Sequence, residues 1–171
     1  MGAPLREPPR RRDSARVLLL DAQGRVLLIE TFDDHDDRPS FWLTPGGGIE
    51  AGETPAAAAA RELLEETGVA TTPAQLGVPV AVARGEWVFR STRLVGQDWF
   101  FVHAAGDVQV RVDGWTPLER EVHRGWRWWT AAELESTDEV VVPGGLGALV
   151  ARLATGWRPE DGPERMAWVA G

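Results

Sequence analysis

The sequence predicts an α+β fold organised as a single domain. Segments with the composition of β-strands are mixed with a few helical segments, without the regular strand–helix–strand alternation of a doubly wound parallel sheet. The chain has 171 residues, which is the usual size of one domain and is enough to bury a hydrophobic core. One helix, at residues 54–67, has clear start and stop signals, and the elements can be placed around it.

The N-terminal part of the chain predicts an arm followed by a hairpin. Residues 1–12 hold three prolines and four arginines with little apolar content, so we expect a flexible N-terminal arm. Two apolar runs, at 16–21 and 25–30, are separated by a short turn that contains Gly24, which predicts a β-hairpin. After a polar loop, residues 41–43 predict a short strand that enters a glycine-rich turn.

Residues 54–67 carry the clearest helix signal. Thr54 is a good N-cap, Pro55 suits the first helical position, and Gly68 stands where a left-handed C-cap belongs. Beyond this helix, segments rich in Val, Phe and Trp predict strands; they are 78–83, 86–90, 98–102, 108–112 and 126–129. Short helices are expected at 117–123 and 131–135. Leucine and valine at helical spacing from Leu146 to Leu153 predict a final amphipathic helix. The domain is therefore expected to span residues 13–156, and residues 157–171 form a C-terminal tail.

Composition excludes several classes of chemistry. The chain has no cysteine, no lysine and no tyrosine, so all 18 of its basic residues are arginine. Thiolate metal sites, cysteine nucleophiles, Schiff-base lysines and P-loop lysines are thereby excluded. A net charge of −8 argues against a stable complex with nucleic acid. The longest apolar runs are far shorter than the ~18 residues needed to span a membrane, and no signal-peptide core is present; we expect a cytoplasmic protein.

Three glutamates on the central helix form an acidic cluster. Glu62, Glu65 and Glu66 follow the spacing i, i+3, i+4, so they share one face. The opposite face is apolar and predicts core packing; it consists of Ala57, Ala60, Leu63 and Leu64. A solvated acidic face is the ordinary interpretation of such a pattern. Like charges repel at this spacing, however, and the helix C-terminus disfavours anions. A hard divalent cation such as Mg²⁺, bound together with substrate phosphates, would offset both effects.

The acidic cluster belongs to a longer motif. Gly47 is followed after five residues by Glu53, and after seven more by the run Arg-Glu-Leu-Leu-Glu-Glu-Thr-Gly-Val at 61–69. This spacing matches every fixed position of the Nudix box, and the chain therefore resembles the Nudix hydrolases. Trp42 to Gly46, and Trp128-Trp129-Thr130 with the following Glu133-Leu134, are similar to further landmarks of the family. The resemblance covers residues 13 to 156.

The resemblance implies both a fold and an activity. The fold is a mixed β-sheet sandwiched between helices, with the box as a loop–helix–loop. The activity is hydrolysis, dependent on Mg²⁺ or Mn²⁺, of a diphosphate linkage in a nucleoside diphosphate linked to another moiety, with water attacking phosphorus. Glu62, Glu65 and Glu66 are implied as catalytic metal ligands, together with a backbone carbonyl near Gly46 or Gly47. A small nucleotide-type substrate and a homodimer are also consistent with the family.

Other residues of the box are implied to support the carboxylates. Arg61 cannot bind a cation, and its expected role in the catalytic set is to hold neighbouring carboxylates, with Glu53 and Glu65 as candidate partners. Glu53 is thus expected to be structural, as are Gly47 and Gly68.

The general base and the substrate contacts stay open at this point. Glu62 and Glu66 are candidates for the base within the box. Candidates outside it are also present, although each is an ordinary surface or structural residue in most proteins; they are Asp98, Glu119, Glu121 and His123. Trp42, Trp87, Trp99 and Phe101 are candidates for stacking on a nucleobase, but tryptophans on strands more often belong to the core.

The substrate is not identified by the sequence. The absence of tyrosine disfavours a diadenosine polyphosphate hydrolase, and Gly85 stands where ADP-ribose pyrophosphatases tend to have proline. The absence of cysteine excludes isopentenyl diphosphate isomerase chemistry, and the negative net charge disfavours an inositol pyrophosphate. A nucleotide or a nucleotide sugar remains. The alternative is a catalytically silent module with the Nudix fold, against which the intact set of three glutamates argues.

Overall fold

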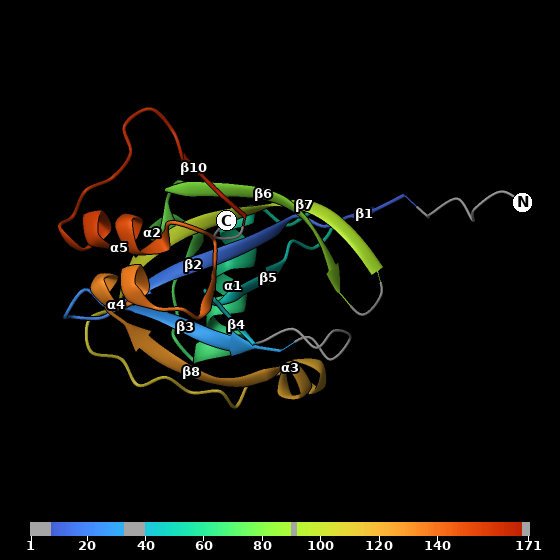
Figure 1. Ribbon diagram of the computed structural model, residues 1–171, viewed down its shortest axis with the longest axis horizontal. Helices are drawn as coiled ribbons and strands as arrows, with labels where there is room; N and C mark the ends of the chain where they lie inside the picture. Colours follow the sequence, from blue (N-terminus) through green and yellow to red (C-terminus); the bar gives the residue numbers. More distant parts are fainter. Residues whose placement is uncertain (1–7, 33–39, 90–91, 169–171) are drawn as a thin grey trace, which may run out of the picture.

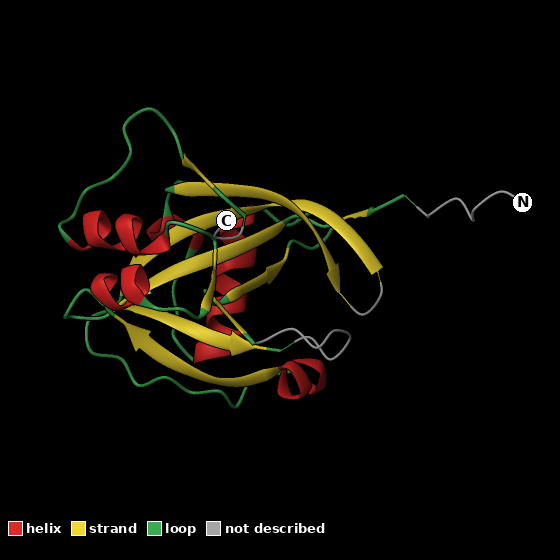
Figure 2. Ribbon diagram, viewed as in Figure 1, coloured by secondary structure: helices red, strands yellow, loops and turns green. Residues whose placement is uncertain are grey.

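The structure is a computed structural model that describes residues 8–32, 40–89 and 92–168. In this part of the chain a curled, mixed β-sheet of ten strands carries helices on both faces (Figures 1 and 2). The strands are β1 (Arg10–Arg11), β2 (Ser14–Leu20), β3 (Val26–Thr31), β4 (Phe41–Leu43), β5 (Gly46–Gly48), β6 (Ala81–Phe89), β7 (Thr92–Ala104), β8 (His123–Trp129), β9 (Val140–Val142) and β10 (Glu164–Met166). The helices are α1 (Pro55–Thr67), α2 (Pro73–Leu76), α3 (Pro117–Val122), α4 (Ala131–Ser136) and α5 (Leu146–Ala154).

The sheet is organised around β2 and β7, which run parallel side by side. The strand order is β10-β6-β7-β2-β3-β4-β9, while β1 pairs with β7, β5 pairs with β2, and β8 pairs with β3. The β2–β3 hairpin and the long β6–β7 ribbon are antiparallel. Parallel and antiparallel pairs therefore coexist, and the mixed sheet that the resemblance implies is confirmed.

Two hydrophobic cores lie on opposite faces of this sheet. Alternate residues of β2 point to opposite sides: Leu18 packs into the core that contains α5, and Val17 packs into the core that contains α1. Leu149 of α5 and Leu63 of α1 are fully buried in these two cores. The helices thus sandwich the sheet, and the predicted fold class is confirmed.

Most predicted elements are present, and the differences have local causes. The hairpin, β4, α1 and α5 lie where they were expected. The strand predicted at 108–112 is wrong: Val108 and Val110 pack against the α1-side core, and Arg111 donates its backbone N–H to the Thr67 carbonyl at 2.8 Å, without strand pairing. The two strands predicted at 78–83 and 86–90 are one strand, β6.

Both ends of the chain contribute strands to the sheet. Arg10 and Arg11, which were expected to belong to a flexible arm, pair with Leu94 and Val95 of β7. In the expected C-terminal tail, β10 pairs with β6. Sequence patterns did not predict α2, β5 or β9 either, and each of these is only three or four residues long. No helix among the described residues has the length and apolar character needed to cross a lipid bilayer.

Candidate active site

Helix α1 places the acidic cluster beside β5. The Thr54 side chain accepts a hydrogen bond from the Ala57 backbone N–H, and Gly68 ends the helix in the left-handed region with φ 73°. The Gly68 N–H donates to the Leu64 carbonyl at 2.9 Å. These predicted caps fix both ends of the helix, so Glu62 and Glu66 lie on the turns that face β5.

The glycines of β5 leave room for these carboxylates. A Cβ atom on Gly47 would lie 2.5 Å from Oε1 of Glu62, so a side chain here would displace that carboxylate. At Gly46 the backbone has φ 145°, and a Cβ would lie 2.3 Å from the Ala15 carbonyl oxygen. The close approach of β5 to both α1 and β2 therefore requires glycine at these two positions.

Arg61 connects the helix to the loop that precedes it. Its Nε and Nη2 donate to the two carboxylate oxygens of Glu53 at 3.0 and 2.9 Å. Its Nη1 donates to Glu62 Oε1 at 2.7 Å, and its Nη2 also donates to the Gly48 carbonyl at 3.1 Å. The hydrogen bond from Arg61 lowers the pKa of Glu53. Glu65 is more remote, 3.5 Å from Nη1, with 44% of its side chain exposed.

Glu62 and Glu66 are buried, which differs from the predicted division of α1 into an acidic face and an apolar face. Their exposed fractions are 7% and 4%, whereas Leu64, expected in the packing stripe, is 51% exposed. The reason is that β5 covers the flank of the helix that carries the two glutamates. Burial raises the pKa of Glu62 to about 7, and burial also raises the pKa of Glu66.

Glu66 has partners on two other segments. Its Oε2 accepts the Gly46 backbone N–H at 2.7 Å, and its Oε1 lies 3.3 Å from His123 Nε2. Carboxylate or imidazole atoms of Glu66, Glu119 and His123 all lie within 4.8 Å of one another. Glu119 is fixed by the capping box of α3, in which its Oε2 accepts the Thr116 N–H at 2.6 Å.

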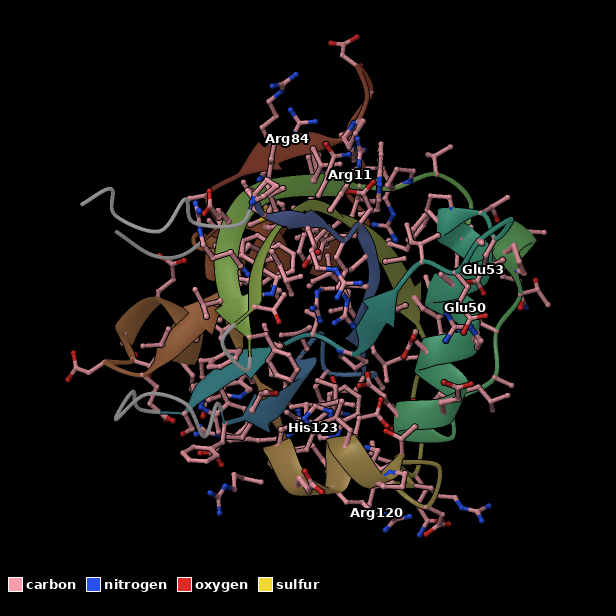
Figure 3. The ribbon with its side chains drawn as sticks, turned by 90° about the vertical axis from the view of Figure 1, so that its right-hand side faces the viewer. Arg11, Glu50, Glu53, Arg84, Arg120 and His123 are labelled. Atoms are coloured by element: carbon pink, nitrogen blue, oxygen red, sulfur yellow. The ribbon has the colours of Figure 1, made fainter. Side chains whose placement is uncertain are left out.

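His123 stands at the start of β8, next to α3 (Figure 3). Its Nδ1 lies 3.2 Å from the Thr31 hydroxyl, and its ring makes an edge contact with Trp115, with the ring centroids 5.0 Å apart. Trp115 in turn donates its indole N–H to the Glu66 carbonyl at 3.0 Å. Glu119 and His123 were both candidates in the sequence, but nothing in their spacing could show that they meet Glu66.

A buried ion pair adjoins the glycine turn. Arg16 donates from Nε to Asp98 Oδ2 at 2.5 Å and from Nη1 to the Thr44 carbonyl at 3.1 Å. The Gly46 carbonyl, a predicted metal ligand, lies 3.5 Å from the same Nη1. Asp98 is fully buried, and its Oδ1 has no hydrogen-bond partner among the described residues. Asp98 therefore serves Arg16 in this structure.

Comparison with known proteins identifies the family. The model of the NUDIX domain matches residues 10–145 of this chain. The chain belongs to the Nudix family. An RNA pyrophosphohydrolase of Novosphingobium aromaticivorans is 35% identical over 145 residues, covering 77% of this chain and 83% of the relative. One from Caulobacter vibrioides is 33% identical over 172 residues, covering 92% and 93%. The chain is a Nudix pyrophosphohydrolase.

A solved structure agrees with this assignment at the level of the fold. The MutT protein of Methanosarcina mazei Go1 superimposes with a TM-score of 0.60 at 16% identity, covering 86% of this chain and 96% of that one. The curled mixed sheet with helices is therefore the Nudix fold, and α1 with its flanking loops is the Nudix box.

The remaining predicted site residues lie away from the Nudix carboxylates or in the core. Trp42 is 8% exposed, makes an edge contact with Trp129 at 5.1 Å between ring centroids, and donates its indole N–H to Glu139 at 2.6 Å. This leaves little of its ring for a substrate to stack on. Glu121 lies on the exposed side of α3.

The donor set of this Nudix site fits a divalent cation. The carboxylates of Glu62 and Glu66 are buried and have raised pKa values, so they need nearby positive charge to become ionised together. Arg61 donates a hydrogen bond to Glu62 but makes no hydrogen bond or ion pair with Glu66. Carboxylate oxygens are the ligands that Mg²⁺ prefers. Two overlapping sets of donors are available, the predicted Glu62, Glu65 and Glu66, and the observed cluster of Glu66, Glu119 and His123. Glu66 belongs to both.

Proposed function

We propose that this Nudix pyrophosphohydrolase uses Mg²⁺ or Mn²⁺, held at Glu66, to hydrolyse a diphosphate linkage in a nucleotide-type substrate. The observation that carries the proposal is the burial of Glu66 between the Gly46 N–H, His123 and Glu119. A carboxylate in this position is oriented by fixed hydrogen bonds, yet its burial leaves it short of positive charge. A divalent cation with substrate phosphates supplies that charge.

The cation, when bound, neutralises the diphosphate and lowers the pKa of coordinated water. Glu66 would hold it, with Glu65 and Glu119 as the nearest further carboxylates. Arg61 keeps Glu62 in place, since it donates to Glu62 from the same guanidinium that is anchored on Glu53. This anchoring explains why an arginine, which cannot bind a cation, belongs to the catalytic set.

Glu62 is our choice of general base. Both oxygens of Glu66 are engaged, whereas Oε2 of Glu62 accepts no hydrogen bond from the described residues. The pKa of Glu62, about 7, also suits a base that works near neutral pH. In the proposed step, water attacks one phosphorus of the diphosphate and its proton passes to Glu62. The bond from that phosphorus to the bridging oxygen breaks, and the other phosphate leaves with the bridging oxygen.

A phosphorylated RNA end is the substrate that the relatives favour. The internal linkages of RNA are phosphodiesters, so a diphosphate linkage in RNA occurs only where an end carries more than one phosphate. Contact limited to such an end is compatible with a net charge of −8, because the enzyme need not bind the RNA backbone. A free nucleotide or nucleotide sugar offers the same linkage and is the second candidate.

A substrate screen with Mg²⁺ tests the proposal. The purified protein is assayed for phosphate or pyrophosphate release from a 5′-triphosphate RNA oligonucleotide, GTP, nucleotide sugars, ADP-ribose and dinucleoside polyphosphates. We expect hydrolysis of at least one of them, a preference for the RNA over GTP, and a loss of about 100-fold or more in Glu66→Gln. Glu160→Gln, at an exposed loop position, is the matched control and keeps the parent rate. No release from any of these substrates, or a Glu66→Gln variant as fast as the parent, would contradict the proposal.

A further inference from the structure

One side chain next to Glu66 differs chemically from the carboxylates around it. Oε1 of Glu66 lies 3.3 Å from Nε2 of His123, and a carboxylate oxygen of Glu119 completes a group whose ligand atoms all lie within 4.8 Å of one another. Oxygen and nitrogen ligands of one cation, each about 2.1 Å from it, lie about 3–4 Å apart. The three side chains are therefore almost at the spacing that a shared ion requires, and His123 supplies the nitrogen donor of the group.

The ring of His123 is held in an orientation that suits a metal ligand. Its side chain is only 9% exposed, and its ring makes the edge contact with Trp115. Its Nδ1 lies 3.2 Å from the Thr31 hydroxyl. Histidines that bind metals almost always use their second ring nitrogen in a hydrogen bond of this kind, which fixes the ring and its tautomer. When Nδ1 donates its proton to Thr31, the lone pair of Nε2 is left for a cation.

The two carboxylates of the group are oriented by the backbone. Oε2 of Glu66 accepts the Gly46 N–H at 2.7 Å, and Oε2 of Glu119 accepts the Thr116 N–H at 2.6 Å. Each carboxylate thus has one oxygen fixed by a main-chain donor and keeps the other oxygen for a ligand. Hydrogen bonds from separate segments therefore orient all three donors of the group, which is how a protein prepares a metal site.

A hydrogen bond between His123 and Glu66 that serves only to position the carboxylate is the alternative interpretation, and the charge of the group argues against it. Among the described residues, Arg61 makes no ion pair with Glu66 or Glu119. Arg120 donates to backbone carbonyls of the loop before α3, from the side of that helix away from His123 (Figure 3). One imidazole carries at most a single positive charge, whereas a divalent cation balances both carboxylates of the group.

We propose that His123 is a nitrogen ligand of the cation at Glu66, and that this ligand makes the protein select Mn²⁺ over Mg²⁺. The inference rests on the proposed function for the presence of a cation at Glu66, but the ligand itself can be tested without turnover. Mg²⁺ binds through oxygen ligands and keeps several of its waters. Imidazole nitrogen favours transition-metal ions, so a set of two carboxylates and one imidazole suits Mn²⁺ better than Mg²⁺.

Electron spin echo envelope modulation of bound Mn²⁺ tests for the nitrogen ligand directly. With equimolar Mn²⁺, the full-length parent should show modulation from a directly bound nitrogen. His123→Gln, which offers an amide oxygen in place of the ring nitrogen, should lose this modulation. His103→Gln is the matched control and keeps it, because His103 also lies next to a threonine hydroxyl, 3.4 Å from Thr71, but is outside the group. A parent protein that binds no Mn²⁺, or whose bound Mn²⁺ shows no nitrogen modulation, would overturn the inference.

Calorimetry with Mn²⁺ and with Mg²⁺ measures the selectivity. His123→Gln should weaken Mn²⁺ binding about 10- to 100-fold and Mg²⁺ binding by a much smaller factor, so that the ratio of the two affinities falls. His103→Gln should keep the ratio of the parent. Equal weakening of both ions in His123→Gln, with an unchanged melting temperature in chelator, would show that His123 only positions Glu66 and would overturn the inference.

The inference and the proposed function can fail separately. Hydrolysis that depends on Glu66, in a protein whose bound Mn²⁺ has no nitrogen ligand, would overturn the inference and leave the proposed function standing. A nitrogen ligand on Mn²⁺ that is lost in His123→Gln, in a protein that hydrolyses no diphosphate, would support the inference and overturn the proposed function.

Discussion

Replacing Glu62 with glutamine should change how the stability of the metal-free protein depends on pH. Burial raises the pKa of Glu62 in the folded protein to about 7, above the ordinary value of 4.5 that applies when the chain unfolds. The folded state therefore holds this proton more tightly than the unfolded state. Its contribution to stability is fully present below pH 4.5 and is lost as the pH rises to 7, after which it stays constant.

The size of the effect follows from the shift. Each unit of pKa difference corresponds to about 1.4 kcal/mol, so ionising Glu62 in the folded protein costs about 3 kcal/mol between low and high pH. Glutamine keeps the shape and the Oε1 acceptor for Arg61 but does not ionise. The free energy of unfolding of Glu62→Gln, relative to the parent, should thus rise by about 2–3 kcal/mol between pH 5 and pH 9.

Urea denaturation followed by tryptophan fluorescence measures this difference, with chelator present and the pH varied from 5 to 9. Glu66 also has a raised pKa, but it is common to both proteins, so the difference between them isolates Glu62 except for coupling between the two groups. Glu160→Gln should follow the parent at every pH. If the parent and Glu62→Gln lose stability in parallel as the pH rises, Glu62 is not a desolvated carboxylate, and its role as base loses its physical support.

Three further predictions concern other parts of the site and fold. Gly47→Ala should lower kcat about 10-fold or more with little change in melting temperature, because its Cβ would lie 2.5 Å from the Glu62 carboxylate; a parent-like kcat would show that the carboxylate tolerates displacement. The Arg12 backbone N–H donates to the Val95 carbonyl at 2.9 Å, but its guanidinium, which lies beside Gly48 of β5, makes no hydrogen bond or ion pair among the described residues. Arg12→Gln should raise KM for a diphosphate substrate about tenfold and reduce its salt dependence, whereas an unchanged KM would exclude contact with phosphate. Hydrogen bonds from the Thr130 backbone and side chain, and from Arg127, lower the pKa of Glu133 to about 2. The stability advantage of the parent over Glu133→Gln should therefore be present above pH 5 and should shrink as the pH falls to 3. A difference in stability that does not vary with pH in melting experiments would contradict this.

The parts of the site that are local in sequence could be predicted. The caps of α1 and the Arg61–Glu53 pair depend on residues at most eight positions apart, and the structure contains both of them. The glycines at 46–48, which were expected to form a turn, instead form strand β5. The burial of Glu62 and Glu66 could not be predicted from helical periodicity alone, because the periodicity of apolar residues shows only the face of the helix that packs on the hydrophobic core. Here a second surface, β5, covers the flank of the helix.

Contacts between residues that are distant in the sequence could not be predicted, for a different reason. Glu66 meets His123 across 57 positions, and that contact depends on how the segment after β7 passes the C-terminal end of α1. The segment crosses there by hydrogen-bonding Arg111 to Thr67 and Trp115 to Glu66, although its valines have the composition of a strand. Similarly, nothing in Gly85 itself shows that Trp168 will cover it, because β10 is only three residues long.

The burial of the Nudix carboxylates connects stability with function. Glu62 and Glu66 are desolvated, and their raised pKa values mean that ionising both groups lowers the stability of the metal-free protein. A cation that binds only the folded state adds about 2.7 kcal/mol when its concentration is 100 times its dissociation constant, which is similar to the cost worked out for Glu62. The charged form of the site and the bound cation are therefore favoured together. Glycine at 46 and 47 is what allows the carboxylates to be buried there at all, since any side chain would occupy the space of the Ala15 carbonyl or the Glu62 carboxylate.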